Sequence, residues 1–209
     1  MHFDLGQWVM SRRLPRFVLA GEQLIPGGYG LDDPRLSDID IAVELRGVGE
    51  VIPTRCVRRL TDNAGKVFID AHSDKHRVLI DLLVMGADKV AIDYMAPKKE
   101  IELAFAYSPH VALRMTIPSS SEPIPFWVAD SLLPRLKELR KSGPKEIWVM
   151  STAKGRMTAF WKALPTAEKK HWRWLLAPDE GREVELLKDP DMPHAWLLSG
   201  DELLQGWSK

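Results

Sequence analysis

A short run of alternating aspartate and isoleucine constrains this chain most strongly. The run Ser37-Asp38-Ile39-Asp40-Ile41 follows a glycine-rich turn, and its period of two predicts a β-strand with two different faces. Both carboxylates would share one face, where they repel each other unless a cation lies between them. Carboxylate oxygens are the ligands that Mg²⁺ prefers, so the pair predicts half of a metal site.

A third carboxylate lies in the middle of a later apolar run, at Asp81. We interpret residues 77–85 as a strand that forms a hairpin with another strand over residues 66–72. If this strand lies beside the first, Asp81 meets Asp38 and Asp40. The three carboxylates could then hold Mg²⁺ or Mn²⁺ against a triphosphate.

Other titratable groups lie close to this hairpin. Asp70 is a rival metal ligand, ranked below Asp81 because less apolar sequence follows it. His72 and His76 flank the connecting turn, where either can assist proton transfer or simply face solvent.

The order of these motifs, from glycine turn to paired aspartates to lone aspartate, resembles the DNA polymerase β-like nucleotidyltransferase superfamily. The resemblance covers roughly residues 15–95. It implies an α+β nucleotidyltransferase fold, with a mixed β-sheet flanked by helices. It also implies that Asp38, Asp40 and Asp81 are the catalytic and metal-binding residues. Small phage and bacterial enzymes distantly like CCA-adding enzymes are the most similar members.

The same resemblance implies that a glycine turn receives the nucleotide phosphates on backbone amides. Two places in the sequence fit this glycine turn, one at Gly21 and one at Gly27-Gly28. Ser37 would lie near the same phosphates. Glu22 departs from the family pattern, because a second glycine or a serine is usual there.

The chain of 209 residues predicts two regions. Residues 1–117 would form the catalytic core and residues 118–209 a mainly helical C-terminal region, with a turn-rich boundary at residues 118–125. Apolar periodicity predicts C-terminal helices over residues 126–140, 145–164 and 167–176, and a helix in the core over residues 53–64.

Net charge is zero, but the middle of the chain is basic: residues 110–174 hold 12 Lys+Arg and 5 Asp+Glu. Such an excess suits a polyanionic partner, although a solvated helix face gives similar counts. The residues expected to contact the acceptor or the phosphates are Arg77, Arg135, Lys137, Arg140, Lys154 and Arg156.

The composition indicates the cellular compartment. The chain has one cysteine, Cys56, which cannot form an internal disulfide, and its sequence has no run of 18 apolar residues. We therefore expect a cytoplasmic protein with no membrane partner.

The leading hypothesis is a metal-dependent nucleotidyltransferase that moves a nucleoside monophosphate from an NTP such as ATP to a hydroxyl acceptor, such as the end of a tRNA. One alternative is nucleotidylylation of a protein or a small molecule, as toxin-like and antibiotic-modifying members do. Another is a nucleic-acid-binding relative without turnover. Glu22 favours loss of activity, whereas the full set of aspartates favours catalysis.

Overall fold

The strands of the computed structural model form one closed sheet. The structure describes residues 13–46, 52–119, 122–151, 153, 155–177, 193 and 195–200. Eight strands run parallel and close when the last pairs with the first, from Arg13 opposite Trp196 to Arg16 opposite Ser199. In barrel order they are β1 (Arg13–Ala20), β4 (Ile41–Glu44), β5 (Val67–Ser73), β6 (Lys89–Asp93), β7 (Val111–Thr116), β8 (Glu146–Met150), β9 (Arg173–Ala177) and β10 (Ala195–Ser199).

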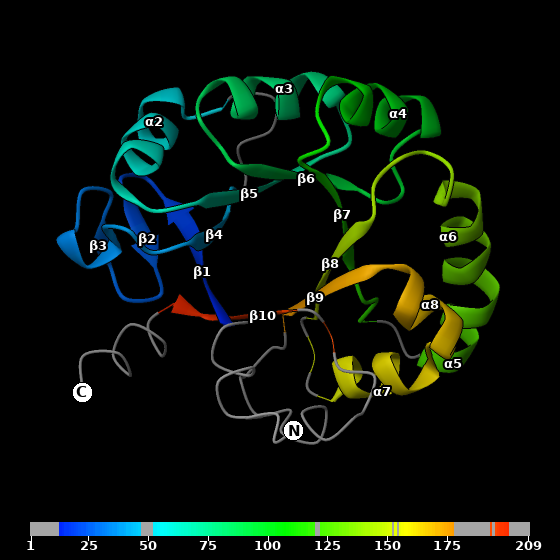
Figure 1. The fold of residues 1–209 in the computed structure, drawn as a ribbon. Helices are drawn as coiled ribbons and strands as arrows, with labels where there is room; N and C mark the ends of the chain where they lie inside the picture. The colour runs from blue at the N-terminus through cyan, green and yellow to red at the C-terminus, as the bar shows by residue number, and fades with distance from the viewer. Residues whose placement is uncertain are drawn as a thin grey trace, which may run out of the picture.

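Helices connect the parallel strands and cover the outside of the barrel (Figure 1). They are α2 (Thr54–Asn63), α3 (His76–Val84), α4 (Lys98–Tyr107), α5 (Ile124–Trp127), the π-helical turn η2 (Val128–Leu132), α6 (Leu133–Leu139), α7 (Arg156–Ala163) and α8 (Thr166–His171). The β1–β4 connection differs, because it holds two short antiparallel strands, β2 (Gln23–Ile25) and β3 (Tyr29–Gly30), and the 3₁₀ turn η1 (Pro34–Leu36).

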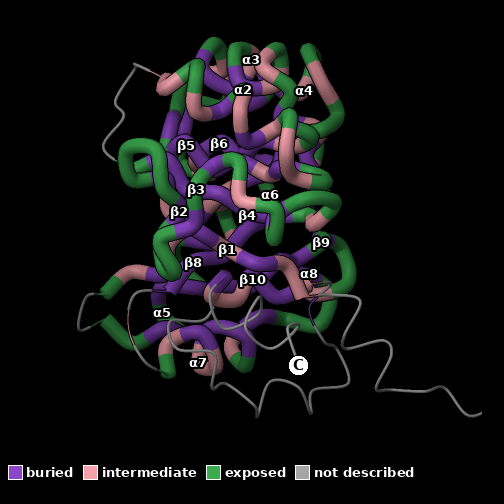
Figure 2. Tube along the Cα trace, turned by 90° about the vertical axis from the view of Figure 1, so that its left-hand side faces the viewer, coloured by how far each residue is buried: buried purple, intermediate pink, exposed green. Residues whose placement is uncertain are grey.

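Alternation along each strand produces two apolar layers. One set of side chains packs outward against the helices, and a smaller set fills the barrel interior. Inside, Trp148 is 1% exposed and belongs to the same cluster as Ala42, Ala91 and Ala112. A barrel of eight strands has a fixed interior width, so one indole needs such small neighbours. Figure 2 shows the buried strands in the middle of the molecule.

The expected mixed α+β sheet of a nucleotidyltransferase is wrong, because the observed sheet is a closed parallel barrel. The segment expected as a strand at residues 77–85 is mostly helix α3. Its buried residues Val78, Leu79 and Leu82 follow helical spacing, and Asp81 is exposed. A short apolar run fits both periods, and here packing against β5, β6 and α4 selects the helix.

The described part of the C-terminal region is not helical alone, since it also contributes three barrel strands. Residues 146–150, expected within a helix, form β8, and all five are buried. Strands covered on both faces are apolar throughout and lack the alternation that marks an exposed strand. The barrel therefore takes strands from both sides of residue 118.

Several local expectations are confirmed. The predicted helix at residues 53–64 is α2, and the strand at residues 66–72 is β5. Residues 126–140 form continuous helical turns from α5 through α6. Among the described residues, no helix is both long enough and apolar enough to cross a bilayer.

Candidate active site

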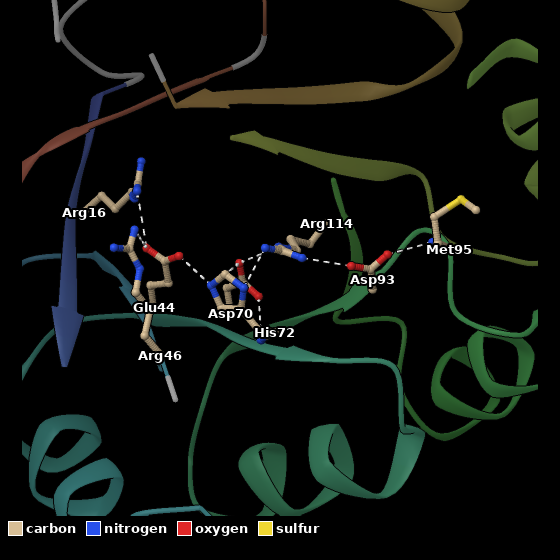
Figure 3. Close-up of polar contacts among 8 residues, drawn as sticks. All are labelled: Arg16, Glu44, Arg46, Asp70, His72, Asp93, Met95 and Arg114. Atoms are coloured by element: carbon tan, nitrogen blue, oxygen red, sulfur yellow. Dashed lines mark hydrogen bonds and ion pairs between the residues drawn. The ribbon is translucent and has the colours of Figure 1, made fainter. Parts of the chain in front are cut away.

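Four consecutive barrel strands carry a charged residue after three apolar ones. These residues are Glu44 in β4, Asp70 in β5, Asp93 in β6 and Arg114 in β7. Three of them come two residues after an alanine of the interior cluster, and Asp70 comes two after Phe68, which packs on that cluster. By strand alternation they also face inward, towards the carboxyl ends of the strands. Figure 3 shows them gathered with Arg16 and His72.

His72 lies at the centre of this charged cluster. Its Nε2 is 2.5 Å from Glu44 Oε1, and its Nδ1 is 2.6 Å from an Arg114 Nη2. A guanidinium can only donate, so Nδ1 is the acceptor and the proton of the neutral ring lies on Nε2, which donates it to Glu44. The two contacts thus fix both the ring orientation and its tautomer.

The backbone at His72 is strained. Its φ is +52°, in the left-handed region that β-carbon sterics disfavour, and the pairing of β5 with β6 shifts register between Asp70 and Ser73. Such a conformation costs about 1–3 kcal/mol and persists only where surrounding contacts hold it. The irregularity sits in the strand that supplies both Asp70 and His72.

Asp70 is almost fully buried beside His72. Burial raises the pKa of its carboxyl, although electrostatic interactions with His72 and Arg114 and a hydrogen bond from the His72 backbone N–H oppose this. Asp70 Oδ2 lies 3.2 Å from Arg114 Nε and 3.7 Å from His72 Nε2, and it accepts no hydrogen bond. This oxygen is therefore placed to hold a proton.

Glu44 is the register partner of Asp70 in the neighbouring strand, but its pKa is shifted in the opposite direction. Burial alone would raise its pKa. Hydrogen bonds from His72 and Arg46 and the charge of Arg16 outweigh burial, and the pKa of Glu44 falls far below its usual range. Two neighbouring carboxylates whose pKa values are driven apart are typical of an acid–base site.

Arg114 joins the two halves of the cluster. Besides His72 and Asp70, it contacts Asp93, whose Oδ2 accepts from Nη1 at 2.8 Å. Asp93 Oδ1 in turn accepts from the Met95 backbone N–H at 2.8 Å. A chain of polar contacts thus runs from β4 to the loop after β6.

Metal binding is a second chemical possibility for these residues. One ligand atom each from Glu44, Asp70 and His72 lies within 4.8 Å of the others, the one such group in the part of the chain that the structure describes. However, Arg16 and Arg46 already contact Glu44, and Arg114 contacts Asp70. A divalent cation would compete with three guanidinium groups.

The three aspartates that the sequence singled out do not converge. Asp38 and Asp40 lie in the loop before β4, where Asp40 Oδ1 accepts from the Lys66 backbone N–H at 2.9 Å. Asp81 is exposed on α3 and lines a surface cavity of about 440 Å³ with Arg77 and other residues of the α3 and α4 N-termini. None of the three belongs to the group of Glu44, Asp70 and His72 at the barrel mouth, the end of the barrel where the carboxyl ends of its strands lie.

The expected phosphate-binding glycines are turn residues. Gly21 follows β1 with a φ of +61°, and Gly27 and Gly28 form the β2–β3 turn with φ values of +106° and +64°. Ser37 makes an isolated bridge with Ala64. These positions do not form one helix N-terminal cradle, because β1 leads into a hairpin and not into a helix.

The expected basic residues mostly contact protein groups. Arg135 donates to the carbonyls of Tyr94 and Ala96, at 2.9 and 2.5 Å. Arg140 pairs with Glu168, and Arg156 donates to the Glu122 carbonyl at 3.2 Å. Lys137 lies on α6, and Lys154 lies outside the described residues. Contact of this set with RNA stays a prediction.

A closed parallel barrel with polar groups at the carboxyl ends of its strands defines the TIM-barrel class, in which active sites lie at that end. A solved structure of N-(5′-phosphoribosyl)anthranilate isomerase from Pyrococcus furiosus is similar, with a TM-score of 0.58 and 13% identity over 89% of this chain and 88% of that one. No family model and no curated protein sequence matches this chain.

This likeness corrects the functional hypothesis as well as the fold. The nucleotidyltransferase assignment is wrong, together with the NTP-dependent enzyme class and the ATP-binding role that followed from it, because the chain folds as a closed parallel barrel similar to that of a solved isomerase. The signature at Asp38 and Asp40 is a local coincidence of sequence. The strand that follows it, β4, belongs to a closed parallel barrel and not to the mixed sheet that the signature predicted.

Proposed function

We propose that this chain is an acid–base enzyme that moves a proton within a small substrate bound at the barrel mouth, as isomerases do. The observation that carries the proposal is His72, held at a positive φ between Glu44 and Arg114 and beside the buried Asp70. General acid–base catalysis needs a proton donor and a proton acceptor in one pocket.

The residues divide into proton carriers and positioning groups. Asp70 keeps its proton to a higher pH than usual and would give it to one substrate atom. His72 would take a proton from another substrate atom at Nδ1, once the substrate has displaced Arg114 from that nitrogen. Glu44 orients the ring through Nε2. The substrate then loses one proton and gains one, and its composition is unchanged.

The structural likeness supplies one compound to test. The similar barrel is named as an isomerase of N-(5′-phosphoribosyl)anthranilate. At 13% identity the two chains share a fold, so that compound enters as one candidate beside other small sugar phosphates and oxo acids.

The test is hydrogen exchange in D₂O, followed by ¹H NMR on a panel of phosphorylated aldoses and ketoses, N-(5′-phosphoribosyl)anthranilate and 2-oxo acids. We expect one class to exchange a carbon-bound proton with the wild type and to lose at least ~100-fold in rate in Asp70→Asn and His72→Gln. Asp40→Asn is the matched control, because Asp40 lies before β4 at the other end of that strand. Exchange that survives both mouth substitutions would contradict the proposal.

A metal-assisted hydrolase is the second candidate, because Glu44, Asp70 and His72 can offer three ligand atoms. Mg²⁺ or Mn²⁺ would then be required for turnover, and chelation would abolish it. Proton exchange that continues in excess EDTA favours the first proposal. A cytoplasmic location remains part of the proposal, supported by the single cysteine.

A further inference from the structure

Arg16 lies between two cavities at the barrel mouth. The first is small and reaches the acid–base cluster, since Glu44, Asp70 and Trp148 line it together with Arg16. The second has a volume of about 220 Å³ and lies along β1, where Val18, Ile25, Pro26 and Ser199 are among its lining residues. Arg16 and Leu197 line both. A ligand in the second cavity would therefore lie next to the proposed proton carriers.

The second cavity arises from the way the barrel closes. β10 pairs with β1 only from Arg13 to Arg16, and β2 pairs with β1 from Val18 to Ala20. β10 and β2 thus follow each other along β1, and a seam opens between them where Ser199 is the register partner of Arg16. The walls are mostly apolar, and an apolar wall strengthens any ion pair formed against it.

Arg16 at this seam shares its carboxylate partner with a second arginine. Arg16 Nη2 and Arg46 Nη2 lie 3.3 and 3.0 Å from the same oxygen, Glu44 Oε2 (Figure 3). The other Glu44 oxygen contacts His72. A guanidinium has five N–H donors, and among the described residues the hydrogen-bond partner of Arg16 is Glu44. Most donors of Arg16 are left for a ligand.

We propose that the seam cavity binds an oxyanion group of the substrate, a phosphate or a carboxylate, with Arg16 as its charged ligand and the Ser199 hydroxyl as a second donor. Forked N–H groups suit the paired oxygens of either anion. The inference rests on the proposed function, because it places the anionic end of the same substrate against Arg16, which contacts Glu44 and also lines the cavity that reaches Asp70. It makes the substrate a small anion, bound at one end and deprotonated at the other.

Anion binding can be measured without any turnover. Inorganic phosphate and acetate, at matched ionic strength set with NaCl, are titrated into the full chain and followed by calorimetry and by Tm. We expect saturable binding of at least one of them, and which one binds distinguishes a phosphate ligand from a carboxylate. Arg16→Met should weaken this binding by about ten- to a hundredfold, the value of one or two charge-assisted hydrogen bonds.

Three further variants make the test specific. Arg16→Lys keeps the charge but loses the paired N–H donors of the guanidinium, so anion binding should weaken several-fold. This variant replaces Arg16→Met in the test if Arg16→Met fails to fold. Arg58→Met is the matched control, because Arg58 is exposed on α2, and its phosphate affinity should equal the wild type. Ser199→Ala should weaken binding by a smaller factor.

The inference is overturned if neither anion binds saturably, or if both Arg16 variants bind as tightly as the wild type. Its failure differs from failure of the proposed function. Asp70→Asn and His72→Gln should still bind phosphate, whatever their effect on proton exchange. Exchange that survives both substitutions, with anion binding intact, contradicts the proposed function alone. Absence of saturable anion binding, with exchange lost in both variants, contradicts the anion site alone.

Discussion

Glu44 and Asp70 are neighbours in the sheet, yet their surroundings favour different protonation states. Both side chains are nearly buried, at 5% and 3% exposure, so burial alone does not separate them. The difference lies in hydrogen bonding. Glu44 accepts from His72, Arg16 and Arg46, whereas Asp70 Oδ2 accepts from none of its neighbours. Mutations of the two should therefore have opposite pH signatures.

Glu44→Gln should destabilise the protein near neutral pH by about 2 kcal/mol, or roughly 6 °C in Tm, because it leaves Arg16 and Arg46 without their carboxylate. The pKa of Glu44 is lowered on folding, so the stability it contributes is fully present above the ordinary glutamate pKa and is lost as pH falls through the folded value. The gap to wild type should narrow below about pH 4.3. A gap that stays constant with pH would contradict this account.

Asp70→Asn should show the reverse trend. The folded pKa of Asp70 is raised, so the native state binds more protons than the unfolded chain. Wild-type stability then falls as pH rises from about 3.9 through the raised pKa, and asparagine removes this loss. Melting curves from pH 4 to 8 should show that the Tm of the variant rises relative to that of the wild type as pH increases. If the Tm of the variant instead fell relative to the wild type over that range, Asp70 would be ionised and in a stabilising ion pair.

At the scale of elements, the four charged strands share one pattern. Residues 41–44, 67–70, 90–93 and 111–114 each place a charge after three apolar residues, and the charges are 26, 23 and 21 residues apart. Such spacing is that of one strand and one helix per unit. No repeat is obvious in residue identity, but this repeat of charge position was the signal that could have predicted both a parallel sheet and its mouth.

Helix α3 offers a direct test of the corrected element. Leu82 is fully buried beneath α3, so Leu82→Ala should cost about 2–5 kcal/mol in the free energy of unfolding. Asp81 is exposed one residue earlier, and Asp81→Asn should change stability by less than about 0.5 kcal/mol. Chemical denaturation of both variants measures the difference. Equal effects would contradict the helical phase seen here.

At the scale of the whole molecule, barrel closure joins the two ends of the described chain. β1 lies between β4 and β10, and through this contact Arg16 of the first strand meets Ser199 of the last. No local segment contains the proposed anion site or the acid–base cluster. Both exist only once the sheet has closed.

Closure also predicts how the chain unfolds. Residues 1–119 contain β1 and β4 to β7 but neither β8, β9 nor β10, so two open edges would be left on a parallel sheet. We expect this fragment to lack a cooperative thermal transition by circular dichroism, whereas the full chain melts in one. A cooperative melt of the fragment would instead support an independent domain before residue 118.

The sequence by itself determined the local elements whose period is unambiguous, such as α2 and β5, and it marked Asp70 and His72 as titratable groups near a strand end. It could not decide between helix and strand for α3 or β8, because short buried runs are apolar in either form. Nor could it choose among the carboxylates, since alternation fixes which face a side chain takes but not which strand lies beside it. Only the parallel register and closure of the barrel brought Glu44, Asp70, His72 and Arg114 together and left Asp38, Asp40 and Asp81 apart, because those pairings join residues far apart in the chain.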